Sequence, residues 1–141
     1  DPCHILRPED CLRLVGGASG DILLCDVCGG FGEGLLRRIL CDTDRIIAVI
    51  DPLPSAMMAN PARLELLMEL ENAGLDLRYV LNKMNRGVNR RELRAFYRMR
   101  LAAEIPFFDP AQIYLAEYNC CTLHAMPKLN AELARHFAAL R

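Results

Sequence analysis

The feature of this sequence that most constrains its fold is a series of short apolar runs separated by segments of helix length. The runs cover residues 21–26, 45–50, 77–82 and 101–105, and each is too brief for a buried helix. The segments between them are too long for hairpin turns, so the strands cannot simply fold back on their neighbours. This alternation predicts an α/β fold in which parallel strands are joined by helical crossovers.

The predicted helices lie between and after these strands, and proline, acidic residues or glycine mark several of their ends. We expect helices over residues 7–15, 34–41, 55–72, 89–99, 109–118 and 127–140. The run at 45–50 is apolar on both faces, which is typical of a central strand covered by helices. We therefore predict one domain of residues 1–141, a three-layer α/β/α arrangement around a mostly parallel sheet of about four strands.

Composition excludes some functions and favours a location. A formal charge of −1 gives no electrostatic reason to expect a nucleic-acid partner by default. No apolar run reaches the roughly 18–20 residues of a membrane span, so no transmembrane segment is predicted. The seven cysteines are odd in number and sit among apolar residues, so we expect them to be reduced and mostly buried. These observations predict a cytoplasmic protein, and a start at Asp-Pro instead of Met favours a fragment or a processed form.

Four segments, at residues 21–30, 43–55, 81–83 and 105–109, resemble in this order the C-terminal two-thirds of a MinD/ParA-type P-loop ATPase. Residues 21–30 (DILLCDVCGG) resemble the Walker B strand and second switch, and residues 43–55 are similar to the following strand and loop. Residues 81–83 (LNK) resemble a later strand end, and residues 105–109 (IPFFD) the loop after the next strand. Residues 115–123 follow the outline of the next segment, without its glycine. The members that act in pilus assembly and septum placement are the most similar.

The resemblance implies roles for six residues in a partial P-loop NTPase fold. It implies that Asp26 binds Mg²⁺ and senses the terminal phosphate, because Mg²⁺ prefers oxygen ligands and such an Asp ends a buried parallel strand. An asparagine amide carries both donor and acceptor groups and can read an adenine edge. The remaining implied nucleotide-binding residues are Gly29, Gly30, Asn82, Pro106 and Phe107.

Each of these residues also has a purely structural interpretation. Asp26 can cap a helix or form an ion pair, and Asn82 is a common turn residue. The glycines at 29 and 30 can mark a tight turn without any ligand.

The chain lacks the phosphate-binding loop that the family writes as K-G-G-x-G-K-[ST]. Its only lysines are Lys83 and Lys128, and neither follows a glycine-rich loop. This chain is therefore predicted to be inactive alone. In the family, the strand that carries this loop lies between the strands corresponding to 21–26 and 45–50. Without it, those two strands must close up, leave a slot for another segment, or pair with another chain.

Three functions follow from these observations. The first is a nucleotide-binding, ATPase-like switch, a fragment of a larger ATPase that uses ATP and Mg²⁺ and positions or regulates cellular machinery. Its implied partners are a second copy, the missing N-terminal segment, and a protein of a positioning or secretion machine. The second is a catalytically inactive interaction module of the same fold, with no cofactor. The third is a response-regulator receiver with Asp26 as phosphoacceptor and Lys83 as its lysine, although Glu9 and Asp10 open a helix and provide no paired-acid motif.

A cysteine pattern and an arginine pattern each allow more than one interpretation. Cys25-x-x-Cys28 has metal or redox spacing, but its only complement would be Cys120 and Cys121 with His124. The arginines at 90, 94 and 98 share one helix face, which is either a solvated face or a contact for an anion or nucleic acid.

Overall fold

The structure, a computed structural model, describes residues 8–27, 32–97 and 101–138. The chain divides into two compact units, Asp1–Asp44 and Arg45–Arg141, and each is described by itself. In the described part of the chain, no helix is long and apolar enough to cross a membrane.

The first unit contains two helices, α1 (Pro8–Gly17) and α2 (Glu33–Cys41), close to the predicted ranges. Both carry acidic residues in the first turn, where they complement the helix dipole. In α2 the buried residues Leu36, Ile39 and Leu40 recur at i, i+3 and i+4, which defines a single apolar face. These two predicted helices are confirmed.

Residues 21–26, predicted to form a strand, adopt no regular secondary structure. Ile22 and Leu24 are almost fully exposed, and no described strand pairs with this segment. The strand prediction is wrong here for a physical reason. An apolar run becomes a strand only where a neighbouring strand accepts and donates its backbone hydrogen bonds, and the described residues provide none.

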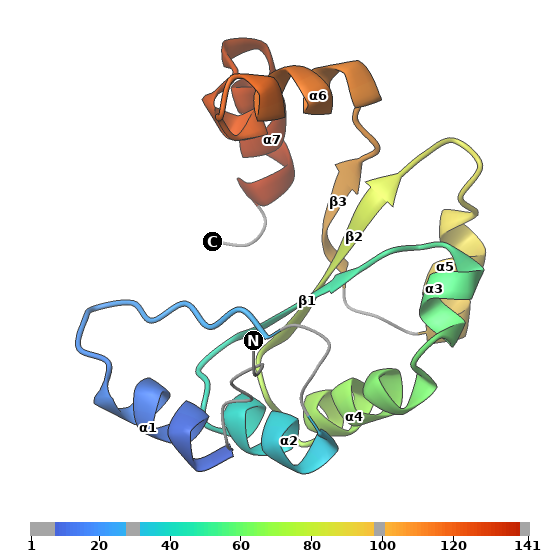
Figure 1. Ribbon diagram of the computed structural model, residues 1–141. Helices are drawn as coiled ribbons and strands as arrows, with labels where there is room; N and C mark the ends of the chain where they lie inside the picture. Colours follow the sequence, from blue (N-terminus) through green and yellow to red (C-terminus); the bar gives the residue numbers. More distant parts are fainter. Residues whose placement is uncertain (1–7, 28–31, 98–100, 139–141) are drawn as a thin grey trace, which may run out of the picture. The chain divides into compact units, whose positions relative to one another are not determined.

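The second unit is built on a parallel sheet of three strands in the order β1-β2-β3 (Figure 1). The strands are β1 (Ile46–Ile50), β2 (Leu77–Met84) and β3 (Leu101–Pro106). Ile46 is in register with Leu77 across the first pair, and Val80 with Ala103 across the second. The predicted α/β class, the parallel pairing and these three strands are confirmed, but the described residues form three strands and not the predicted four.

Burial differs sharply between the strands. The central strand is β2, in which Tyr79, Val80 and Leu81 are essentially fully buried. The strand β1, predicted to be central and covered on both faces, lies at an edge and leaves Ile47 and Val49 exposed. That prediction is wrong because apolar sequence on both faces does not itself supply a second neighbour or a cover.

Helices follow each strand of the second unit (Figure 1). Helix α4 contacts β2 and α7 contacts β3, and each buries two leucines spaced four residues apart. Helix α6 begins as predicted, since the Asp109 carboxylate accepts a hydrogen bond from the Ala111 N–H at 2.9 Å. The helical elements are α3 (Pro54–Met58), α4 (Pro61–Asn72), α5 (Arg90–Tyr97), α6 (Pro110–Tyr118), the 3₁₀ turn η1 (Leu123–Ala125) and α7 (Pro127–Phe137).

The single helix predicted over residues 55–72 is divided between α3 and α4. Pro61 starts the second helix, and Asn60 before it is not helical, with φ of −147° and ψ of 70°, which agrees with the bias of residues before proline against the α region. The predicted stop at Gly74 is confirmed, with φ of +92°. The N–H of Gly74 donates to the Glu71 carbonyl and that of Leu75 to the Leu70 carbonyl, which is a complete Schellman motif.

Candidate functional site

The carboxyl ends of the three parallel strands form the best candidate for a site. Ligands of open α/β sheets bind outside this edge. We call the residues that the second unit brings there the carboxyl-edge site: Asp51 after β1, Asn82 and Lys83 near the end of β2, Pro106 at the end of β3, and Phe107 after it.

Asp51 and Lys83 form an ion pair across two strand ends, with 3.1 Å between Oδ2 and Nζ. The other carboxylate oxygen of Asp51 accepts a hydrogen bond from the Leu53 N–H at 3.1 Å. The pKa of Asp51 lies below its ordinary value, chiefly because of the Leu53 N–H and also because of the Lys83 ammonium, against partial desolvation. Asp51 is therefore a fixed, ionised carboxylate, although its partner's side chain is 56% exposed and the pair contributes little stability.

The backbone of β2 departs from regular geometry at Asn82 and Lys83. Leu81 is in register with Glu104 and Met84 with Pro106, so β2 holds one extra residue between these points. Lys83 has φ of +60°, a conformation that non-glycine residues seldom adopt, and its N–H donates to the Asn82 side-chain oxygen at 2.9 Å. Such bulges re-aim side chains and are frequent beside active sites.

Three of the predicted base-binding residues come together at this edge. Pro106 is in register with Met84, and the Phe107 N–H donates to the Met84 carbonyl at 2.8 Å. This places Asn82 two residues from the backbone that Phe107 contacts. The Phe107 side chain is exposed and Asn82 is half-buried. The arrangement offers an amide and an aromatic ring on adjacent strand ends.

The other predicted site residues are placed differently. Asp26 belongs to the first unit and lies in its irregular segment, while Gly29 and Gly30 lie outside the described residues. The carboxyl-edge site, as described, therefore consists of second-unit residues alone. The described side chains contain no group of three or more His, Cys, Asp or Glu able to hold a metal ion.

The cysteine predictions are in part wrong. Cys25, Cys41 and Cys120 are exposed free thiols, although burial was predicted, and Cys121 is a half-buried free thiol. Cys25 is exposed because its segment is not packed as a strand. Cys28, the other member of the Cys-x-x-Cys pattern, lies outside the described residues.

The predicted arginine face is partly neutralised by an acid on β3. Arg90 Nε lies 2.7 Å from one Glu104 carboxylate oxygen, and Arg94 lies 3.1 Å from the other. Arg98 lies outside the described residues. These pairs tie α5 to β3 and favour the structural interpretation of this face.

Sequence reasoning assigned no role to Asp51. A usable signal was present, because Asp51 and Lys83 each follow an apolar strand and parallel strands end at a common edge. Comparison of the chain with protein-family models, curated proteins and solved structures gave no match. The fold and the carboxyl-edge site thus define an α/β protein with a parallel sheet and a polar strand-end site.

Proposed function

We propose that this chain is a nucleotide-binding switch domain of the MinD/ParA type and part of a larger ATPase that positions or regulates cellular machinery. The observation that supports it most is the grouping of Asn82, Pro106 and Phe107 on neighbouring strand ends. A bulge and a positive φ at Lys83 hold this edge in an unusual shape, as backbone strain often does at functional sites.

The chemistry of the carboxyl-edge site suits a nucleobase. The Asn82 amide can donate to and accept from a base edge, and the exposed Phe107 ring can cover the face of the base. The Asn82 oxygen already accepts the Lys83 N–H, so the amide N–H₂ group is the one we assign to the base.

The proposed phosphate and metal functions rest on fewer residues. Asp26 is the one carboxylate that we propose for Mg²⁺, with Gly29 and Gly30 beside the phosphates. The 141 residues contain no K-G-G-x-G-K-[ST] loop. ATP and Mg²⁺ are therefore proposed ligands of a longer product, completed by an N-terminal segment, and this chain is expected to hydrolyse nothing alone. A second copy and a protein of a positioning or secretion machine are its proposed partners.

Calorimetric titration of ATP with Mg²⁺ tests this proposal on the 141-residue chain and on the longest product of its gene. We expect measurable binding by the longer product. Asn82→Ala should weaken it about tenfold, the value of one hydrogen bond to a buried polar partner. Asp26→Ala should abolish the Mg²⁺ dependence.

Matched controls are Asn72→Ala at the end of α4 and Asp44→Ala, and both should bind like the unmodified protein. Absence of binding by both the chain and the longer product would contradict the proposal. That result would favour the second candidate, a catalytically inactive interaction module, which the absent phosphate loop already supports.

A further inference from the structure

The strand β1 has one paired and one unpaired edge in the part of the chain that the structure describes. The Ile46 N–H donates to the Asp76 carbonyl at 2.9 Å, so the backbone groups of Ile46 point toward β2. Successive residues of a parallel strand point these groups alternately to either side. Ile47 and Val49 therefore direct their N–H and C=O groups outward, where no described strand pairs with them.

The same two residues also carry the exposed side chains of β1. Ile47 is 45% exposed and Val49 is 62% exposed, while Ile46 and Ala48 are buried on the opposite face. Alternation places the flanking residues Arg45 and Asp51 on the face of Ile47 and Val49. An apolar strand edge with unpaired backbone groups is a template for pairing with another strand.

We propose that β1 pairs edge to edge with β1 of a second copy, in antiparallel orientation about a two-fold axis at Ala48. In that register Ile47 lies opposite Val49 of the second copy, and Arg45 lies opposite Asp51 of the second copy. The segment Arg45–Asp51 (RIIAVID) is thus complementary to itself when reversed, since a cation meets an anion at each end and apolar residues meet between them.

The backbone geometry favours the same register. Residues of an antiparallel pair that exchange both hydrogen bonds must each point their N–H and C=O toward the partner. Pairing Ile47 with Val49 satisfies this condition, because both are outward-pointing. If the register shifted by one residue, backbone groups that point outward from one β1 would face residues of the other β1 whose groups point inward. If it shifted by two residues, Arg45 would lie opposite Val49.

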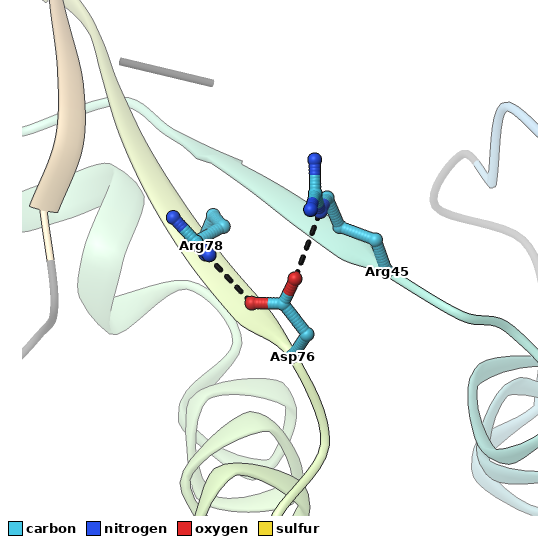
Figure 2. A network of polar contacts seen from close by, with 3 residues as sticks. All are labelled: Arg45, Asp76 and Arg78. Atoms are coloured by element: carbon cyan, nitrogen blue, oxygen red, sulfur yellow. Dashed lines mark hydrogen bonds and ion pairs between the residues drawn. The ribbon is translucent and has the colours of Figure 1, made fainter. Parts of the chain in front are cut away.

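Arg45 and Asp51 are already positioned by neighbours. Arg45 Nε donates to one oxygen of Asp76 at 2.8 Å, and Arg78 Nε holds the other oxygen at 2.6 Å (Figure 2). Asp51 is held by Lys83. Arg45 and Asp51 are thus held as opposite charges near the two ends of β1. The fixed charges favour an identical partner over an unrelated strand.

Sedimentation of the full chain without nucleotide tests the proposal. A short two-strand interface is small, so we expect a dimer with Kd of about 100 μM or tighter. Val49→Lys should raise this Kd roughly tenfold or more, because a lysine would lie in the apolar centre of the pairing. The matched control is Met58→Lys on α3, whose methionine is 65% exposed, and this variant should dimerise like the unmodified chain.

A double variant tests the register. Ile47→Glu alone and Val49→Lys alone should each weaken the dimer, but Ile47→Glu with Val49→Lys places opposite charges face to face in both symmetric pairs. If the two single losses simply added, they would predict a certain Kd for the double variant. We expect the measured Kd to be at least about threefold lower than that predicted Kd. The double variant leaves the net charge of the chain unchanged, so it also separates the pairing from the charge that each single substitution adds.

Three outcomes would overturn the proposal. They are a chain that stays monomeric to about 1 mM, a dimer that survives Val49→Lys, and purely additive losses in the double variant. None of these results depends on nucleotide, and the pairing is tested on the 141-residue chain. In the longer product of the proposed function, the strand supplied by the N-terminal segment would occupy this edge of β1 in place of a second copy. Failure of ATP binding by the longer product therefore leaves the pairing of the 141-residue chain untouched.

Discussion

Val49 and Val80 are neighbours in register across the β1–β2 ladder, yet their environments are opposite. Val49 is 62% exposed, whereas Val80 is 1% exposed. Both belong to short apolar runs that read alike in the sequence. The difference is position, because among the described strands β2 has a neighbour on each side and β1 has one on a single side. Strand propensity therefore identifies strands but does not rank them from edge to centre.

The largest expected effect comes from truncating the two valines in parallel. Val80→Ala should lower the free energy of unfolding by about 2 kcal/mol, because a fully buried side chain leaves a cavity. Val49→Ala should change it by less than about 0.5 kcal/mol, because its methyl groups lie largely in water. Urea denaturation at a protein concentration well below the measured dimer Kd makes the comparison. Equal losses would show that the exposed face of β1 is covered in solution.

A second prediction concerns β2 itself and compares its regular part with the bulge at Lys83, where the backbone has a positive φ. Lys83→Gly should be more stable than Lys83→Ala by about 1 kcal/mol, because glycine adopts φ of +60° without strain. Both variants lose the ion pair with Asp51, so their difference isolates the backbone conformation. Denaturation of the two variants measures it. An alanine variant as stable as the glycine variant would mean that the backbone at this position is not left-handed.

The smallest effect concerns the amino ends of β1 and β2, where Asp76 joins Arg45 and Arg78 (Figure 2). The pKa of Asp76 lies below its ordinary value of about 4 because of the Arg78 and then the Arg45 hydrogen bonds. Its folded pKa is depressed, so its stabilisation is complete above pH 4–5 or so and is lost as the pH falls through the folded pKa. The thermal midpoint of the unmodified chain should therefore exceed that of Asp76→Asn near neutral pH and converge with it in acid.

Added salt gives an independent check on the ion pairs of Asp76 with Arg45 and Arg78. Because all three side chains are partly exposed, 0.5 M salt should narrow the difference in midpoint between the unmodified chain and Asp76→Asn at pH 7. A difference that is independent of both pH and salt would mean that packing, and not charge, accounts for the effect of Asp76.

Prediction from sequence succeeded where the signal is local. Pro110 with Asp109 as a cap fixed the start of α6, and Gly74 fixed the end of α4 through a positive φ. The prediction of a single helix over residues 55–72 failed at Pro61. The helical spacing of the apolar residues favoured one helix, although a proline disfavours the helical conformation of the residue before it. At the candidate site, Asn82, Pro106 and Phe107 were predicted individually, but the bulge that groups them depends on pairing with β3.

The sequence by itself determined several helix ends, the three paired strands and their parallel direction, because caps, turns and apolar periodicity act over a few residues. Only the tertiary structure decided that residues 21–26 form no strand and that β1 lies at an edge of the sheet that the described residues form. It also decided that Asp51 meets Lys83. The physical reason is that a strand's hydrogen bonds and burial are supplied by segments distant in sequence, and an apolar run does not specify which segment supplies them.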